Sequence, residues 1–283
     1  MLFIKGGNLM LVTSKELFQK AQQQHFAIPA PNFIDLESLR WHMETAEKLK
    51  LPLLLALAEA HIGNNITLED AALLGKKYAE QAKIPVILHL DHGTTPELIK
   101  KAIDFGFTSV MVDASQYPFE ENVKRTNEIV EYAHKRGVVV EAEIGYVGAN
   151  ENFEGHEGKD SRYTTVEEAK KFVEQTNVDS LAISIGTAHG IYKGTPKINF
   201  ERLKEIRTEI DTPLVLHGGS SSGDENLKRC AMEGITKINI FSDLLVAAKT
   251  EIDNNKPKTY LEIKEAAKKG MQQCLEHYYN LLS

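Results

Sequence analysis

The sequence predicts a (β/α)8 barrel, the TIM barrel fold, formed as a single domain over residues 1–283 with an extra helix at the carboxyl end. Short β-branched or leucine-rich runs alternate with longer stretches of helical period, the pattern of βαβ units around a parallel sheet. Eight such runs occur, and neither a linker nor a composition shift divides the chain into halves. The length also fits, because α/β barrels of about 250 residues form single domains. These features favour a closed barrel over a doubly wound sheet.

The expected strands are spaced so that a helix fits after each of them. Thr95 and Pro96 mark the start of one such helix, and Gly106 marks its end. The last helical stretch runs from about Tyr260 to Leu282, and we expect it to pack on the barrel exterior. The expected strands are residues 27–32, 53–58, 86–90, 109–113, 138–143, 180–186, 214–218 and 237–240.

Composition and charge indicate an ordinary globular protein and exclude several partners. Hydrophobic residues make up 42% of the chain and charged residues 26%. The net charge is −7 and lysines are interleaved with glutamates, so we expect no nucleic-acid partner. The amino terminus lacks the continuous apolar stretch of a signal peptide, and no long apolar run follows, so we expect neither export nor membrane insertion. Cys230 and Cys274, both in helical stretches, fit a reduced, cytoplasmic setting.

Histidines stand at the carboxyl ends of several expected strands, where TIM-barrel active sites lie. His92, His189 and His217 each precede a glycine at such a position. Neutral imidazole is a preferred zinc ligand, and a catalytic zinc ion takes three protein ligands and leaves one position open. A lone buried histidine is usually a core residue, but three at equivalent positions predict a metal site. We expect His89 in the barrel interior or beside a ligand, and we expect no such placement for the remaining histidines, His61 among them.

Carboxylates accompany these histidines. Asp91 directly precedes His92, and the pleat is expected to send the two side chains in different directions at the strand's end. We expect Asp91 to act as a general base, with orientation of a histidine as the alternative role. Glu143 is an alternative metal ligand or a ligand-orienting group, and Glu141 lies deeper on the same side.

Two segments near the carboxyl end predict a phosphate site. They are HGGSSSG, residues 217–223, after the seventh strand, and NIFSD, residues 239–243, after the eighth. TIM barrels commonly bind phosphate after these two strands. Glycines let backbone N–H groups approach an anion, and a following helix amino terminus adds a favourable dipole. The first segment alone would also fit a flexible loop, but the pair favours phosphate binding.

Several motifs together closely resemble, in order and spacing, those of class II fructose-bisphosphate and tagatose-bisphosphate aldolases. The similarity runs from about Pro29 to Tyr260, nearly the whole chain. The motifs are HLDHG (89–93), SVMVDAS (109–115), VEAEIG (140–145), IGTAHGIYKGTP (185–196), PLVLHGGSS (213–221) and KINIFSD (237–243).

The resemblance implies cleavage of a ketose 1,6-bisphosphate, by default fructose 1,6-bisphosphate, to dihydroxyacetone phosphate and an aldehyde such as glyceraldehyde 3-phosphate. A zinc ion on His92, His189 and His217 would polarise the ketose carbonyl and stabilise the enediolate. Asp91 would take the proton from the C4 hydroxyl. Glu151, in the loop after the fifth strand, would move protons on the enediolate. Tagatose bisphosphate or another sugar phosphate is the alternative substrate.

The resemblance also implies further contacts and partners. It implies at least a dimer, so we expect a homodimer or a homotetramer, and it leaves open a monovalent cation, Na⁺ or K⁺. Contacts to the substrate and its phosphate would fall on Asn32, Gly190, Gly218, Gly219, Ser220, Asn239, Ile240, Phe241 and Ser242.

Some positions depart from the family pattern. Ala58 replaces a common serine, Asn150 replaces a frequent glutamate, and Phe241 stands where Asn, Asp or Ala is usual. Lys258 replaces an arginine that, in the family, reaches a neighbouring subunit's active site and holds the distal phosphate. Lysine lacks the bidentate fork of arginine, so the far end of the substrate need not be a 6-phosphate.

Two other functions compete with an aldolase. One is a zinc hydrolase in which Asp91 activates a metal-bound water molecule. The two phosphate segments and the lack of a second carboxylate or a carbamylated lysine for a dinuclear site count against it. The other is a non-catalytic sugar-phosphate-binding protein, motivated by the departures above. Retention of Asp91 and of all three histidines counts against that hypothesis.

Overall fold

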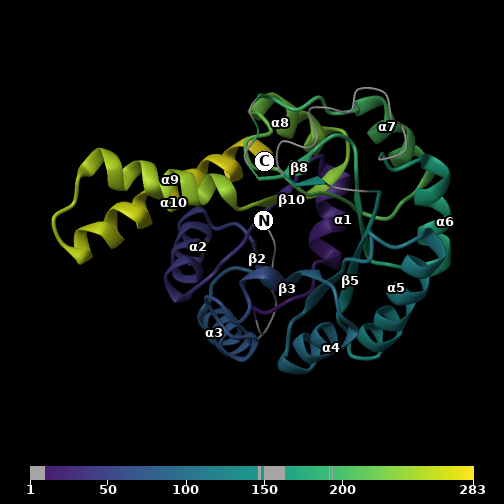
Figure 1. The fold of residues 1–283 in the computed structure, drawn as a ribbon, viewed down its shortest axis with the longest axis horizontal. Helices are drawn as coiled ribbons and strands as arrows, with labels where there is room; N and C mark the ends of the chain where they lie inside the picture. The colour runs from purple at the N-terminus through teal and green to yellow at the C-terminus, as the bar shows by residue number, and fades with distance from the viewer. Residues whose placement is uncertain (1–9, 146–147, 150–162, 191, 193) are drawn as a thin grey trace.

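Eight parallel strands form a barrel in the computed structural model (Figure 1), which describes residues 10–145, 148–149, 163–190, 192 and 194–283. The strand order is β1-β10-β9-β7-β5-β4-β3-β2, and a backbone bridge between Asn32 and Ala56 brings β1 and β2 together. All eight expected strands are confirmed. They are β1 (Ile28–Pro31), β2 (Leu53–Ala58), β3 (Val86–Gly93), β4 (Ser109–Val112), β5 (Val139–Ile144), β7 (Ser180–Ile183), β9 (Leu214–Leu216) and β10 (Ile235–Ile240).

A helix follows each barrel strand and covers the outside of the sheet. The last barrel helix, α9, comes directly after β10, so the long helix α10 is a second, additional helix after the last strand. The short strands β6 (Gly148–Ala149) and β8 (Ala188–His189) pair with each other outside the barrel sheet. The barrel helices are α2 (Leu36–Leu49), α3 (Leu68–Gln81), α4 (Pro96–Phe105), α5 (Phe119–His134), α6 (Val166–Thr176), α7 (Phe200–Glu209), α8 (Asp224–Met232) and α9 (Ser242–Asn255).

Helix starts and stops follow the local chemistry that the sequence indicates. Helix α4 begins after Thr95, whose side chain accepts a hydrogen bond from the backbone N–H of Leu98, and Pro96 occupies the first turn. It ends at Gly106, which has a φ of 103° and so takes the left-handed conformation that glycine adopts without strain. The boundaries expected for this helix are confirmed.

The two-residue period of the pleat divides the strand side chains into two sets. On β3, Leu88 and Leu90 belong to the apolar layer between the strands and the helices. His89 and Asp91 therefore face the barrel interior, and both are almost fully buried. The same alternation turns inward Glu141 and Glu143 on β5 and Lys237 and Asn239 on β10. The barrel interior is thus unusually polar.

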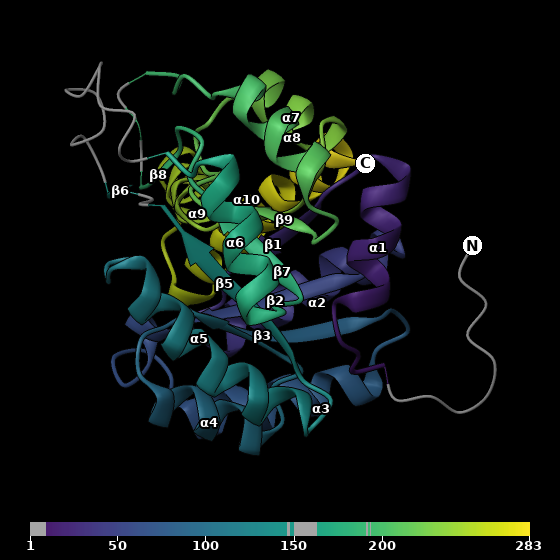
Figure 2. The same cartoon turned by 90° about the vertical axis from the view of Figure 1, so that its right-hand side faces the viewer.

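Helix α1 (Lys15–Gln24) closes the amino-terminal end of the barrel. Its Leu17 and Phe18 pack against Ile28, Leu54 and Ile87 from the starts of three strands. In Figure 2, α1 lies on the opposite side of the molecule from β6 and β8. The polar interior is therefore sealed by an apolar layer at one end, and the carboxyl ends of the strands provide the accessible end.

Helices α9 and α10 (Tyr260–Leu282) form a hairpin that projects from the barrel (Figure 1). The two helices approach closely at Gly270, where an added Cβ would lie 2.3 Å from the carbonyl oxygen of Ala247. Leu275 and Leu282, later in α10, are buried in the main apolar core, so the expected packing on the barrel exterior holds for this part of the helix. Among the helices that the structure describes, none combines the length and apolar character needed to cross a membrane.

Substitution of Gly270 should loosen this hairpin. We expect Gly270→Ala to push α9 and α10 apart and to destabilise the protein by about 1–3 kcal/mol, the usual cost of overpacking. The measurement is the midpoint of thermal unfolding followed by circular dichroism. Gly194→Ala is the matched control, because an added Cβ there meets no atom within 4 Å. Equal midpoints for the two variants would contradict the close approach.

Candidate active site

A pocket opens at the carboxyl ends of the barrel strands. It brings together residues from β1, β2, β3, β8 and β10 and from the loop after β9. Most of the residues that the sequence predicts for the site line it, together with His61 and Ala58. The lining residues are Asn32, Ala58, His61, Asp91, His92, His189, Gly190, Gly218, Ser220, Asn239, Phe241 and Ser242.

Three imidazole rings converge beside this pocket. The Nε2 atom of His92 lies 3.1 Å from Nε2 of His189 and 2.9 Å from Nδ1 of His217. The ligand atoms of the three residues all lie within 4.8 Å of one another. Nitrogens bound tetrahedrally to one zinc ion at about 2.0–2.1 Å are separated by roughly 3.3 Å. The observed spacing therefore suits a single metal ion.

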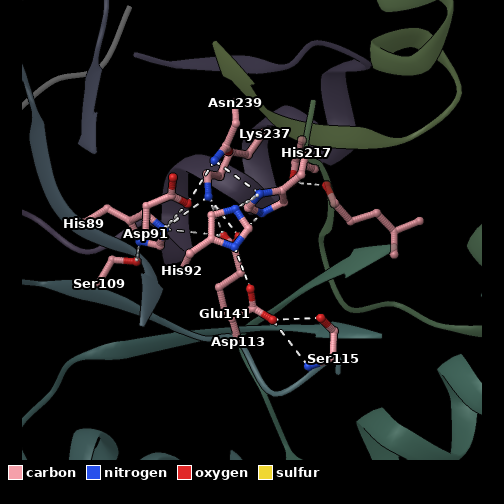
Figure 3. Close-up of polar contacts among 12 residues, drawn as sticks. His89, Asp91, His92, Ser109, Asp113, Ser115, Glu141, His217, Lys237 and Asn239 are labelled. Carbon is pink, nitrogen blue, oxygen red and sulfur yellow. Dashed lines mark hydrogen bonds and ion pairs between the residues drawn. The ribbon is translucent and has the colours of Figure 1, made fainter. Parts of the chain in front are cut away.

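Carboxylates fix the orientation of two of these rings (Figure 3). Nδ1 of His92 donates to Asp113 at 2.8 Å, and Asp113 in turn accepts from the Ser115 hydroxyl at 2.8 Å. Nε2 of His217 donates to Glu141 at 2.9 Å. In each ring the nitrogen that is not bound to a carboxylate faces the other histidines. Metal-ligating histidines use this arrangement to set their tautomer.

The backbone at His92 departs from regular strand geometry. His92 has a φ of 52°, in the left-handed region that side chains other than glycine rarely adopt. The expected alternation of the pleat is therefore broken at this residue, and Asp91 and His92 both line the pocket. Such strain is concentrated at functional sites, where surrounding contacts hold it. Here the contact is the hydrogen bond from His92 to Asp113.

The charges around the rings favour a bound cation. Burial and the neighbouring His92 lower the pKa of His189 to about 3, and the same two causes lower the pKa of His217, so both rings are neutral donors of a lone pair. Burial also lowers the pKa of His92, but Asp91 and Asp113 outweigh burial and raise it to about 9. The carboxylates thus create a negative potential that stabilises positive charge at this point. These residues fit a divalent metal ion.

A second group of ligand atoms lies next to the first. Atoms of His92, Asp113 and Glu143 also fall within 4.8 Å of one another. Glu143 is buried, and its backbone carbonyl accepts from the side-chain amide of Asn122. The sequence argument that the site lacks a second carboxylate is therefore wrong. Asp113 and Glu143 both approach His92, which is consistent with Glu143 as an alternative ligand.

Asp91 is held between two asparagine side chains. Asn32 donates to one carboxylate oxygen at 3.0 Å, and Asn239 donates to the other at 2.9 Å. Burial alone would raise the pKa of Asp91, but the nearby His92 and Lys237 lower it well below its usual range. The residue is therefore an ionised acceptor with a fixed orientation inside the pocket.

The loop after β9 forms a cradle under the start of helix α9. Gly218 has a φ of 68°, and a Cβ there would lie 2.3 Å from the carbonyl oxygen of Ala188, so only glycine fits. The Ser220 hydroxyl accepts from the backbone N–H groups of Phe241 at 3.1 Å and Asp243 at 3.3 Å. This places Ser220 at the positive end of the α9 dipole, which favours anions.

Helix α10 supports the loop after β9 through Asp243. Asp243 accepts from the backbone N–H and the hydroxyl of Ser221, both at 2.7 Å. It also accepts from the hydroxyl of Tyr278, a buried residue of α10. Ser221 has a φ of 58° and needs such support in a left-handed conformation. The loop geometry thus depends on a helix distant in sequence.

Two expected substrate contacts do not line the pocket. The Ile240 side chain belongs to the apolar layer outside the barrel, because its neighbour Asn239 takes the inward position. Gly219 packs closely against Ile238 and donates its N–H to the carbonyl oxygen of Asn239. Both residues shape the backbone of the site instead of facing its cavity.

Two further expectations fall elsewhere. Lys258 lies in the turn between α9 and α10, away from this pocket, with its backbone N–H bonded to Glu262. Its action on a neighbouring subunit therefore stays a prediction. Glu151 and Asn150 lie outside the described residues.

Sequence reasoning missed several residues of the site. His61 follows β2 and lines the pocket with its ring centroid 4.7 Å from that of Phe241, although it belongs to neither group of candidate metal ligands among the described residues. Asp113, just beyond the end of β4, is the partner of His92, and Glu141, which the sequence offered only as the deeper and weaker candidate, is the partner of His217. Their signal in the sequence is an acid at the end of a strand, the same signal that identifies Asp91. His89 lies in the barrel interior as expected.

Comparison with known proteins agrees with this geometry. The model of the family "Fructose-bisphosphate aldolase class-II" matches residues 12–283. The YdjI aldolase of Escherichia coli K12 is 34% identical, with a TM-score of 0.86 over 96% of this chain and 97% of that one. A protein of Coccidioides immitis assigned as a fructose-1,6-biphosphate aldolase is 30% identical, with a TM-score of 0.82 over 94% of each chain.

A more distant structure has the same fold. The fructose-bisphosphate aldolase of Campylobacter jejuni is 24% identical, with a TM-score of 0.78 over 96% of this chain and 95% of that one. The family match covers nearly the whole chain, including His92, His189 and His217 and the two segments expected to bind phosphate, residues 217–223 and 239–243. The chain therefore belongs to the class II fructose-bisphosphate aldolase family and is a lyase.

Proposed function

We propose that the protein is a zinc-dependent aldolase that reversibly cleaves a ketose 1,6-bisphosphate, with fructose 1,6-bisphosphate as the default substrate. The products would be dihydroxyacetone phosphate and glyceraldehyde 3-phosphate. One observation carries this proposal: three imidazole nitrogens converge beside the ionised carboxylate of Asp91. Two asparagine side chains hold that carboxylate in place by hydrogen bonds. The alternative substrate is tagatose 1,6-bisphosphate or a related sugar phosphate, which would be cleaved by the same reaction.

His92, His189 and His217 would hold the zinc ion, with Glu143 as an alternative ligand. A zinc ion there supplies a Lewis acid that polarises the substrate carbonyl and stabilises the negative charge left when the carbon–carbon bond breaks. Asp91 would accept the proton of the C4 hydroxyl, because its carboxylate is ionised and lies beside the ligands. Asn32 and Asn239 supply one hydrogen bond to each of its oxygens and leave the remaining lone pairs for substrate.

The phosphate of the dihydroxyacetone phosphate half would lie in the cradle formed by Gly190, Gly218, Ser220 and Ser242. Backbone N–H groups and the amino terminus of α9 favour an anion there without a cationic side chain. Apart from Phe241, the residues of this half follow the pattern that the resemblance implies. Glu151 would complete proton transfer on the carbon that loses its bond.

The other half of the pocket favours a second candidate, a ketose whose distal end carries no phosphate. Among the described residues that line the pocket, none is a lysine or arginine, and the rings of His61 and Phe241 lie in contact there. A distal phosphate would therefore need a cation from beyond these residues. Lys258 of a neighbouring subunit is the proposed source.

We propose at least a homodimer in the cytoplasm, and a tetramer is consistent with the same contacts. Tyr260 and Leu261 at the start of α10 are more than 70% exposed, and both lie beside Lys258 in sequence. A second subunit that covers these apolar side chains would also receive Lys258. This arrangement supports the role of Lys258 without placing it in its own subunit's pocket.

Family membership separates the aldolase from the two competing functions. The hydrolase hypothesis loses one objection, because Asp113 and Glu143 lie close to His92. The proteins that match the chain are aldolases, so they give the hydrolase hypothesis no support. A binding protein without catalysis would have no use for an ionised Asp91 held beside the metal ligands.

Removal of the metal and loss of Asp91 should have different effects. We expect chelation to abolish cleavage and added Zn²⁺ to restore it, whereas Asp91→Ala should keep zinc and lose about 10²–10⁴-fold in kcat, the usual contribution of a general base. The measurements are release of dihydroxyacetone phosphate and zinc content by atomic absorption. Full activity after complete removal of metal would disprove the proposal.

Lys258 should matter only when the substrate has a distal phosphate. We expect Lys258→Met to lower kcat/KM for fructose 1,6-bisphosphate by about tenfold to a hundredfold, because it removes a charged hydrogen bond worth about 1.5–3 kcal/mol. The value for fructose 1-phosphate should not change. Lys256→Met, in the same turn, is the matched control. Identical kinetics for both variants would instead support the unphosphorylated distal end.

A further inference from the structure

A chain of buried polar side chains runs through the barrel interior beneath the pocket (Figure 3). Ser109 lies 2.7 Å from Nδ1 of His89, whose Nε2 lies 3.1 Å from the ammonium of Lys237. Lys237 donates to both carboxylate oxygens of Glu141 at 2.8 Å. Glu141 then accepts from His217 at 2.9 Å. The chain thus ends on one of the proposed metal ligands.

Every member of this chain lies out of contact with solvent. Lys237 and His89 are 0% exposed, and Glu141 is 1% exposed. In the sheet register, Ala56 lies beside His89 and Ile28 beside Lys237, and both are buried apolar residues. Replacement of a buried ion pair by apolar residues is often neutral or stabilising. Stability alone therefore does not explain a lysine at this position.

The contacts of Lys237 use all of its hydrogen-bonding capacity. Its three N–H groups match three acceptors, the two oxygens of Glu141 and Nε2 of His89. His89 accepts through Nε2 and so donates through Nδ1 to Ser109. Both ends of the Glu141 carboxylate are thereby held, and the carboxylate cannot rotate away from His217.

We propose that Lys237 is a positioning residue for the metal site: it clamps Glu141, which holds the hydrogen on Nε2 of His217 and leaves Nδ1 to bind the metal. The inference rests on the zinc site of the proposed function. Lys237 touches neither the substrate nor the metal in this role. Its effect on the ligand His217 passes through Glu141, which it contacts by two hydrogen bonds.

This role predicts a loss of metal affinity that is separate from any loss of stability. Lys237→Met alone leaves Glu141 as an unpaired buried charge, so this variant is a poor test. The double variant Lys237→Met/Glu141→Gln removes both charges together and keeps similar side-chain volumes. Its amide is a weaker acceptor than a carboxylate and is no longer clamped, so the His217 ring loses its fixed orientation.

A second variant keeps the charges. Glu141→Asp retains a carboxylate that can pair with Lys237 but shortens the side chain by one methylene group. A carboxylate drawn back in this way cannot hold Lys237 and His217 at the observed distances simultaneously. The surface pair Lys100→Met/Glu128→Gln, whose ammonium and carboxylate lie 2.6 Å apart, is the control for loss of an ion pair far from the site.

The experiment measures binding of Zn²⁺ and Co²⁺ alone by chelator competition, together with the visible absorption spectrum of bound Co²⁺. Circular dichroism and thermal unfolding of the same preparations identify which variants are folded. We expect both interior variants to bind Zn²⁺ about 10–100-fold more weakly than the wild type, the usual effect of losing a partner of a metal ligand. The Co²⁺ spectrum should change, and the surface control should match the wild type.

Zinc affinity within twofold of the wild type, in either interior variant that is folded, would overturn the inference while leaving the proposed function intact. A wild-type protein that binds neither ion would overturn both together. Because Glu141→Asp preserves the buried charge pair, the test does not depend on the folding of the double variant.

Discussion

The inward pleat of β3, β5 and β10 is the constraint on which the site depends. Because side chains alternate along a strand, the positions that turn Asp91 and Asn239 toward the pocket also turn His89, Glu141 and Lys237 toward the barrel axis below it. The proposed reacting groups and the groups that orient them are thus successive layers of one set of strands. A register shift of one residue would send all of them into the apolar layer under the helices.

Much of this arrangement could be predicted from sequence, because it follows from local patterns. All eight strands were expected within a few residues, and the three histidines were identified by their place after a strand and before a glycine. In a parallel barrel, all strand ends meet at one rim, so position along the chain translates directly into position in space. This is why His92, His189 and His217 converge as expected.

Other features of the site depend on contacts that no local pattern encodes. Asp113 and Glu141 become partners of histidines that lie on other strands, at spacings set by the barrel closure. The left-handed backbone of His92 overrides the pleat and brings two adjacent side chains into one pocket.

The two halves of the pocket are supported by different parts of the molecule. The proposed metal half rests on strand ends and on the buried Lys237–Glu141 pair, which are enclosed by the barrel. The anion half rests on the loop after β9, which Asp243 and Tyr278 tie to helix α10. Helix α10 also begins beside Lys258, at the exposed end of the hairpin. Changes around Tyr278 can therefore disturb the loop after β9 without touching the buried Lys237–Glu141 pair. This separation keeps the three converging histidines and Asp91 apart from the loop that would hold an anion, within one pocket.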